Sequence, residues 1–149
     1  MATIRPLIPD DIAATLRLWQ GTTPVRSREV ETDDGLTRMV VRNPGVCHVA
    51  LDGGEIVGIA ICGHDGRRGY LHHLGVLAAH RRCGIGHALV EACLAALHAE
   101  GIYRIHVQMK TNNADGLKFW RSLGCKERRD TALISLMLKS DEREGRDDS

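Results

Sequence analysis

The chain has 149 residues, and its 20 Lys and Arg nearly balance its 19 Asp and Glu, for a formal net charge of +1. A chain of this length forms one domain with an ordinary core, and the balanced charge argues against nucleic acid or an anionic membrane as a partner. With one Phe, two Trp and two Tyr, an aromatic platform for single-stranded nucleic acid is not expected. The five cysteines form no C-x-x-C pair, and neither a signal peptide nor a long apolar run is found, so we expect a soluble cytoplasmic protein with reduced thiols.

The first half of the chain predicts a strand, two helices and a hairpin. The strand is expected over residues 3–7, and Asp10 or Asp11 then caps a helix whose apolar residues share one face, namely Ile12, Leu16 and Trp19. Residues 21–44 are harder to assign, but a second short helix after residues 33–35 is suggested by Leu36, Met39 and Val40. Apolar strands over residues 46–51 and 56–62 are joined by Asp52-Gly53-Gly54, a strong hairpin signal.

The second half continues with alternating strands and helices. A strand over residues 70–77 precedes a helix from Gly84 to about Glu100, which ends at Gly101. Apolar and polar residues alternate over residues 103–109, as in a half-buried strand, and a last strand is expected over residues 131–138. Residues 140–149 form a charged tail that we expect to be disordered. With a further helix after Asn113, the order is β-α-α-β-β-β-α-β-α-β in a single mixed α/β domain over residues 1–139.

The turn between the fourth strand and the third helix is the most informative part of the chain. It is basic and carries two glycines one residue apart, Gly84 and Gly86. Glycines let the backbone approach a ligand closely, and the first N–H groups of a helix have no internal partners, so such a turn can hold a phosphate. A nucleoside-triphosphate loop would need Lys followed by Ser or Thr after the last glycine, and a dinucleotide fingerprint would need Gly or Ala where Leu89 stands. The pattern that remains is Arg-x-x-Gly-x-Gly, beginning at Arg81.

This pattern, together with the preceding Leu74-Gly75-Val76, closely resembles the cofactor motif of the GNAT superfamily of N-acetyltransferases. The resemblance implies that the turn binds the pyrophosphate of acetyl-coenzyme A (acetyl-CoA) through Arg81, Arg82, Cys83, Gly84, Ile85, Gly86 and His87. It also implies that the backbone of Leu74, Gly75 and Val76 hydrogen-bonds the pantetheine arm, and that the fourth and fifth strands splay apart to admit the acyl group. The alternative is a plain strand-to-helix turn whose glycines serve packing.

A second segment resembles another helix of the same family, Asn113-Ala114-Asp115-Gly116-Leu117-Lys118-Phe119-Trp120-Arg121-Ser122-Leu123-Gly124-Cys125. Asn112 or Asn113 can cap this helix by accepting a backbone N–H of its first turn. The resemblance implies that Asn113 also holds the pantetheine arm. The alternative is a cap alone, and the two roles are compatible.

Acyl transfer to an amine needs a base for the amine proton and a hydrogen-bond donor for the carbonyl oxygen that becomes negative. By resemblance, the donor is the backbone N–H of Val76. His72 is the candidate base, because its unperturbed pKa of about 6.5 suits proton transfer and its strand is similar to that of serotonin N-acetyltransferases, where a histidine at this place relays the proton. Simple alternation puts Tyr70, His72, Leu74 and Val76 on one face and His73 on the other, unless a bulge breaks the parity. The alternative for His72 is a structural role, and we expect His73 to serve packing.

The chain departs from the family at two positions. Trp120 stands where a tyrosine normally protonates the departing thiolate, and an indole N–H can donate a hydrogen bond but cannot act as an acid near neutral pH. Trp120 therefore either stabilises the thiolate by hydrogen bonding or packs in the core. Gln108 stands where ribosomal-protein N-terminal acetyltransferases carry a glutamate base, so that base is missing. Tyr70 and Tyr103 are candidate substitutes for the acid.

The resemblance predicts an acetyl-CoA-dependent N-acetyltransferase that moves the acetyl group to a primary amine by direct attack in a ternary complex. The alternative is a non-catalytic acyl-CoA-binding or regulatory module on the same fold. The acceptor is expected to be a small-molecule amine or a protein N-terminus, bound around residues 21–44, and a homodimer is compatible with such a domain. No spacing of His and Cys fits a metal site, so none is assigned.

Overall fold

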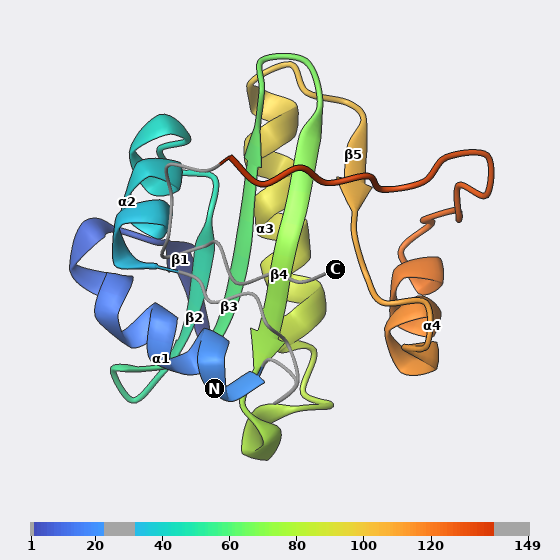
Figure 1. Ribbon diagram of the computed structural model, residues 1–149. Coiled ribbons are helices and arrows are strands. Elements are labelled where there is room, and N and C mark those ends of the chain that lie inside the picture. Colours follow the sequence, from blue (N-terminus) through green and yellow to red (C-terminus); the bar gives the residue numbers. More distant parts are fainter. Residues whose placement is uncertain (1, 23–31, 139–149) are drawn as a thin grey trace. The chain divides into compact units, whose positions relative to one another are not determined.

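The computed structural model describes residues 2–22 and 32–138, and it divides into two compact units, Met1–Val107 and Gln108–Ser149 (Figure 1). The expectation of a single domain over residues 1–139 therefore remains a prediction, and the tail over residues 140–149 lies outside the described residues.

A five-stranded sheet forms the centre of the first unit, with the strands in chain order from one edge to the other. The first four strands pair antiparallel, whereas the fifth runs parallel to the fourth. Gly53 and Gly54, both with positive φ, make the tight turn between the second and third strands that the sequence predicts. The strand bounds are β1 Thr3–Pro6, β2 His48–Asp52, β3 Glu55–His64, β4 Gly69–Val76 and β5 Ile105–Val107.

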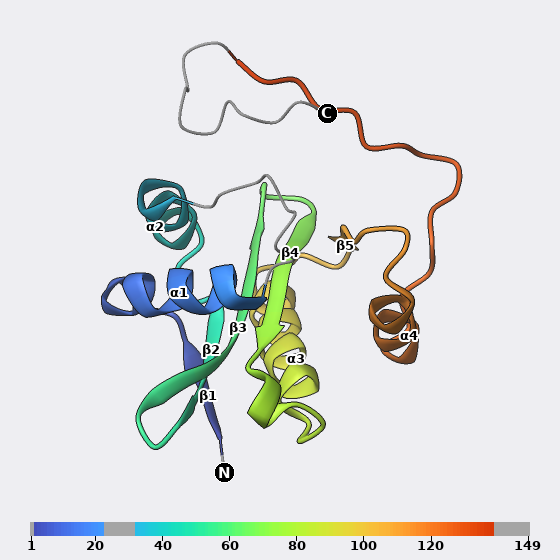
Figure 2. The same cartoon turned by 60° about the horizontal axis from the view of Figure 1, so that its bottom comes forward.

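Helices cover both faces of this sheet, as Figures 1 and 2 show. On one face lie α1 (Ile12–Thr22), which follows the short 3-10 turn η1 (Pro9–Asp11), and α2 (Asp33–Arg42). On the other face lies α3 (Ile85–Ala99), which follows a second 3-10 turn, η2 (Ala78–His80). Because both faces are covered, β3 is a nearly continuous run of buried residues rather than an alternation of buried and exposed ones.

The core of the first unit has one layer on each side of the sheet. Under α3, the buried side chains of Leu89 and Leu97 pack against the sheet. Gly58 of β3 leaves room for this contact, because a Cβ at Gly58 would lie 3.1 Å from both Ile85 and Leu89. The helix α3 therefore packs directly on β3, next to β4. On the opposite side, one cluster joins α1 and α2 to the sheet, formed by Leu7, Ile12, Leu18, Leu36, Val40, Cys47, Val49, Ile59 and Ile61.

The second unit contains α4 (Ala114–Ser122), the helix predicted after Asn113. The last strand, expected over residues 131–138, is not formed, and the large apolar side chains of this segment are exposed. A strand is stable when its backbone N–H and C=O groups pair with a neighbour, and within residues 2–22 and 32–138 no strand pairs with this segment. The observed order, β-α-α-β-β-β-α-β-α, otherwise agrees with the predicted mixed α/β class.

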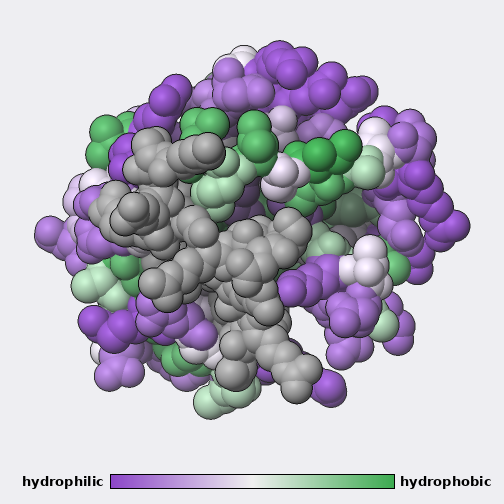
Figure 3. All heavy atoms as spheres, viewed as in Figure 1, coloured by the Kyte–Doolittle hydropathy of each residue, from purple (hydrophilic) through white to green (hydrophobic). Residues whose placement is uncertain are grey.

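Hydrophilic side chains, coloured purple, make up most of the described surface that is visible in Figure 3, with smaller groups of hydrophobic side chains in green among them. In the described part of the first unit, the exposed large apolar side chains are Ile8, Val41, Leu77 and Tyr103. Among the helices of residues 2–22 and 32–138, none combines the length and the apolarity that crossing a membrane requires.

Candidate functional site

A bulge in β4 determines which side chains face which side of the sheet. Ile61 of β3 lies opposite His73, whereas the next residue, Cys62, lies opposite Leu71. His72 is therefore the extra residue of the bulge, and the alternation of side chains changes at this point. The sequence allowed for such a bulge but did not place it.

Because of this bulge, the expectation from simple alternation that Tyr70 shares a face with Leu74 and Val76 is wrong, whereas Leu74 and Val76 do lie opposite His73. Val76 pairs with Gly58, and Gly58 faces α3, so Val76 and Leu74 lie on the α3 side. Gly69 also faces α3, which places the next residue, Tyr70, on the side of α1. His73 lies on that same side, where its ring contacts α1.

His73 is held by two residues of α1. Its imidazole stacks on the indole of Trp19, with 4.8 Å between ring centroids and 10° between ring planes. Its Nε2 lies 3.0 Å from the hydroxyl of Thr22, which also lies 2.9 Å from the carbonyl oxygen of Leu18. If the hydroxyl donates to that carbonyl, it accepts from Nε2–H of a neutral imidazole. Burial lowers the pKa of His73 to about 4, so the ring is neutral at neutral pH.

His72 is the more exposed of the two histidines. Its ring stacks against Tyr70 at 6.1 Å between centroids, and Tyr70 lies 5.7 Å from the ring of His106 on β5. Partial removal of the ring from water lowers the pKa of His72 below its usual value. His72 is therefore mostly neutral at neutral pH and able to accept a proton from solvent or from a ligand.

One edge of β4 is open beside these histidines. The pairing of β4 with β5 covers only Gly69 to Leu71, so in the described residues no strand pairs with the later part of β4 on that edge. The N–H of Leu77 donates to Val57 of β3 over 2.9 Å. Because successive residues of a strand point their N–H groups to opposite edges, the N–H of Val76 faces the open edge. Arg81 Nε donates to the carbonyl oxygen of Val76 over 3.1 Å, and this bond holds the strand end in place.

Two residues of the turn between β4 and α3 have a left-handed backbone conformation. Arg82 has a φ of 63°, and Gly84, the N-cap of α3, has a φ of 79°. Among residues 2–22 and 32–138, no side chain caps the helix, so none of these residues uses the N–H groups of its first turn as a cap. Arg81, Arg82 and Cys83 are exposed, whereas the side chain of Ile85 is buried, so Ile85 offers a ligand only its backbone. The turn thus combines the positive charge of its two arginines with the uncapped N–H groups of a helix start, and both features favour an anion.

A hydrogen bond between a histidine and a carboxylate, which sequence reasoning missed, holds this turn against the sheet. Nε2 of His80, in η2, lies 3.0 Å from Oδ2 of Asp52 at the end of β2. The other ring nitrogen of His80 is buried and has no hydrogen-bond partner among the described residues. Asp52 belongs to the Asp-Gly-Gly turn that predicts the hairpin, but nothing in the sequence indicates that the hairpin end lies beside η2.

The second unit contains two of the predicted site residues, Asn113 and Trp120. Asn113 is the N-cap of α4, and its Oδ1 accepts the N–H of Gly116 over 2.9 Å, which confirms the predicted cap. Trp120 lies on α4 with its ring edge-on to Phe119 at 5.0 Å. The roles of Asn113 and Trp120 toward a cofactor remain predictions.

Buried thiols form a small cluster inside the first unit. The thiol of Cys62 donates to the carbonyl of Val46, and Sγ of Cys93 lies 3.5 Å from Nδ1 of His48. Contact with Cys62, and then with the nearby imidazole of His48, lowers the pKa of Cys93. These side chains fill the core of the first unit. Within the described ranges, no group of three or more His, Cys, Asp or Glu residues is arranged to hold a metal ion.

Comparison with known proteins agrees with this geometry. Residues 12–125 match the acetyltransferase (GNAT) family. An acetyltransferase of Pectobacterium atrosepticum is 34% identical over 111 residues, which cover 74% of this chain and 77% of that protein.

Solved structures share the fold. An aminoglycoside acetyltransferase from an uncultured soil metagenomic sample, in complex with sisomicin, matches with a TM-score of 0.73 at 21% identity, covering 93% of this chain and 97% of that one. Ard1 from Thermoplasma volcanium matches with a TM-score of 0.72 at 22% identity, covering 83% of this chain and 81% of that one.

Proposed function

Because the chain belongs to the acetyltransferase (GNAT) family, we propose that it transfers the acetyl group of acetyl-CoA to a primary amine by direct attack in a ternary complex. The observation that carries this proposal is the open edge of β4, where the N–H of Val76 lies a few residues before the basic turn. The end of β4 thus offers a hydrogen-bond donor for the acyl oxygen, and the turn that follows it offers a site for phosphate.

The residues of the turn fit the phosphates of the cofactor. Arg81 and Arg82 supply positive charge, and Cys83 to His87 supply backbone N–H groups at the start of α3. The positive φ of Arg82 and Gly84 lets these groups converge on one anion. In the second unit, Asn113 would bind the pantetheine arm in addition to capping α4.

The edge of β4 fits the pantetheine arm and the acetyl group. The N–H groups of Leu74 and Val76 face the open edge, whereas alternation turns that of Gly75 toward β3. Leu74 and Val76 would therefore hydrogen-bond the ligand, and Gly75 would contribute space rather than a donor. A fixed N–H at Val76 would stabilise the negative charge that develops on the carbonyl oxygen, at no reorganisation cost.

His72 is the proposed base and Trp120 the proposed donor to the leaving thiolate. His72 stands where β4 and β5 stop pairing, and its lowered pKa keeps the imidazole in the neutral form that accepts an amine proton. The indole N–H of Trp120 would donate a hydrogen bond to the thiolate without protonating it. The acceptor would be a small-molecule amine or a protein N-terminus, bound around residues 21–44. Of this segment, residues 23–31 lie outside the described residues.

The first experiment is a calorimetric titration with acetyl-CoA, comparing the parent with Gly86→Glu and Ala95→Glu. Both variants add a carboxylate to α3, but Ala95 is an exposed position far from the turn. We expect Gly86→Glu to abolish binding, since its charge would repel the pyrophosphate, and Ala95→Glu to leave the affinity unchanged. Equal affinity in all three proteins would overturn the cofactor assignment.

The role of His72 is tested by release of free thiol in a panel of primary amines. With an accepted amine, His72→Ala should lower kcat/KM by about 10²- to 10⁴-fold, the usual contribution of a positioned base, and remove the acidic limb of its pH profile. Binding of acetyl-CoA should not change. A His72→Ala protein that keeps the parent rate and profile would show that another group takes the proton.

A further inference from the structure

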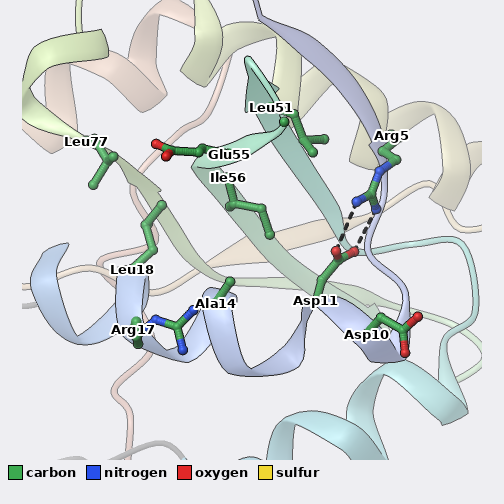
Figure 4. A pocket seen from close by; sticks show the side chains of 11 residues that line it. Arg5, Asp10, Asp11, Ala14, Arg17, Leu18, Leu51, Glu55, Ile56 and Leu77 are labelled. Atoms are coloured by element: carbon green, nitrogen blue, oxygen red, sulfur yellow. Dashed lines mark hydrogen bonds and ion pairs between the residues drawn. The ribbon is translucent and has the colours of Figure 1, made fainter.

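A hollow on the α1 side of the sheet is not used by the proposed chemistry. It lies between α1 and the hairpin of β2 and β3, and its volume is about 550 Å³ (Figure 4). This volume falls within the range of about 300–1,000 Å³ that is usual for small-molecule sites. The hollow belongs entirely to the first unit.

The floor of the hollow is apolar and partly open to water. It is formed by Leu18, Leu51, Ile56 and Leu77, and Leu51 and Ile56 lie opposite each other on the hairpin. Leu77 is 37% exposed although it is a large apolar side chain. Covering this floor with an apolar ligand would remove hydrocarbon surface from water, which is favourable.

One wall of the hollow carries an ion pair whose two side chains bond to each other. Nη1 and Nη2 of Arg5 donate to the two carboxylate oxygens of Asp11 over 2.6 and 2.9 Å, and the N–H of Ile8 donates to the same carboxylate. Hydrogen bonding to Arg5 holds the pKa of Asp11 below its usual value, so the pair stays charged on both sides at neutral pH. This wall offers a ligand no unpaired charge.

Two other charges of the hollow have no such partner. Arg17 of α1 and Glu55 of β3 line opposite sides, and in the described part of the chain neither makes an ion pair or a side-chain hydrogen bond. Figure 4 shows both side chains at the hollow, with Leu18 and Ile56 between them. The remaining charged residue, Asp10, lies beyond the Arg5–Asp11 pair. A cation and an anion thus flank an apolar floor from two separate elements.

We propose that this hollow binds a short apolar peptide with free termini. The terminal carboxylate would accept hydrogen bonds from the guanidinium of Arg17, which suits a carboxylate in a bidentate geometry. The terminal ammonium would donate to Glu55, and the apolar side chains would cover Leu18, Ile56 and Leu77. A single amino acid fits less well, because its two charges sit on one carbon and cannot span the apolar floor between the two walls.

The test uses the dipeptide Leu-Leu, its C-terminal amide and its N-acetyl form, titrated into the full chain without acetyl-CoA. Amide shifts in ¹⁵N spectra report both the affinity and the place of binding. We expect Leu-Leu to bind in the millimolar range, with shifts at Arg17, Leu51 and Ile56. Each blocked peptide should bind about three- to fivefold more weakly, the usual size of one exposed charge contact.

Two variants with matched controls separate the charge contacts. Arg17→Gln should abolish the preference for Leu-Leu over its amide, and Glu55→Gln should abolish the preference for Leu-Leu over its N-acetyl form. Arg38→Gln on α2 and Glu91→Gln on α3, both exposed, should change neither preference. The proposal is wrong if the three peptides bind with equal affinity or if the amide shifts lie outside the hollow. It is also wrong if Leu-Leu does not bind at concentrations of about 10 mM. Because no cofactor is present, these outcomes are independent of the acetyl-transfer reaction.

Discussion

Replacing Gly75 by Ala is predicted to separate α1 from β4. A Cβ at this position would lie 2.5 Å from Oγ1 of Thr22 and 3.0 Å from Nε2 of His73, both closer than van der Waals contact allows. The last turn of α1 must then move, and the hydrogen bond between Thr22 and His73 is lost. Overpacking of this kind costs about 1–3 kcal/mol, which for a chain of this size lowers Tm by roughly 3 °C per kcal/mol.

Thermal and urea unfolding of a double-mutant cycle measure this effect. Thr22→Ala alone should cost about 1 kcal/mol for its hydrogen bonds, but in the Gly75→Ala background it removes the 2.5 Å contact. The double variant should therefore lose about 1 kcal/mol less free energy of unfolding than the sum of the two single-variant losses. Gly21→Ala is the control, because its Cβ would meet nothing within 4 Å and Ala favours a helix. The packing of α1 on β4 would be refuted if the losses of stability in Gly75→Ala and Thr22→Ala were additive. It would also be refuted if Gly75→Ala and Gly21→Ala lost equal stability.

Two further predictions concern the pH dependence of stability. Hydrogen bonding to Arg5 lowers the pKa of Asp11, so the pair stabilises the fold above the unfolded-state pKa of about 3.9 and loses this effect as the pH falls through the lower folded-state pKa. Asp11→Asn should therefore lower the free energy of unfolding at pH 7. In urea unfolding, the difference between parent and variant should close as the pH falls below the folded-state pKa. Burial lowers the pKa of His73 from 6.5 to about 4, so the folded state binds fewer protons than the unfolded state in this range, and stability should fall as the pH drops from 6.5 to 4. His73→Gln should reduce that slope, and an unchanged slope would mean that other groups cause it.

The sequence predicts most of the first unit because its signals are local. The Asp-Gly-Gly turn specifies the β2–β3 hairpin, and the turn with Gly84 and Gly86 marks the start of α3. The alternation over residues 103–109 predicts a longer strand than β5, which has three residues. The apolar pattern over residues 131–138 likewise predicts a strand that the structure lacks. In both cases the pattern reports which residues could face a core, whereas strand length depends on how far a neighbouring strand runs alongside.

The side of the sheet that each β4 side chain faces could not be predicted from the sequence, because it depends on the position of a single extra residue. Alternation has a period of two, so one bulge at His72 transfers every later side chain to the opposite side. The contacts that follow from it, Trp19 and Thr22 with His73, join residues more than fifty positions apart, and no local signal records them. The same bulge leaves the N–H of Val76 directed at the open edge while His73 is fixed by α1. The strand thereby places one histidine in the packing of α1 and leaves its neighbour, His72, exposed where β4 and β5 separate, which is why only His72 is proposed as the base.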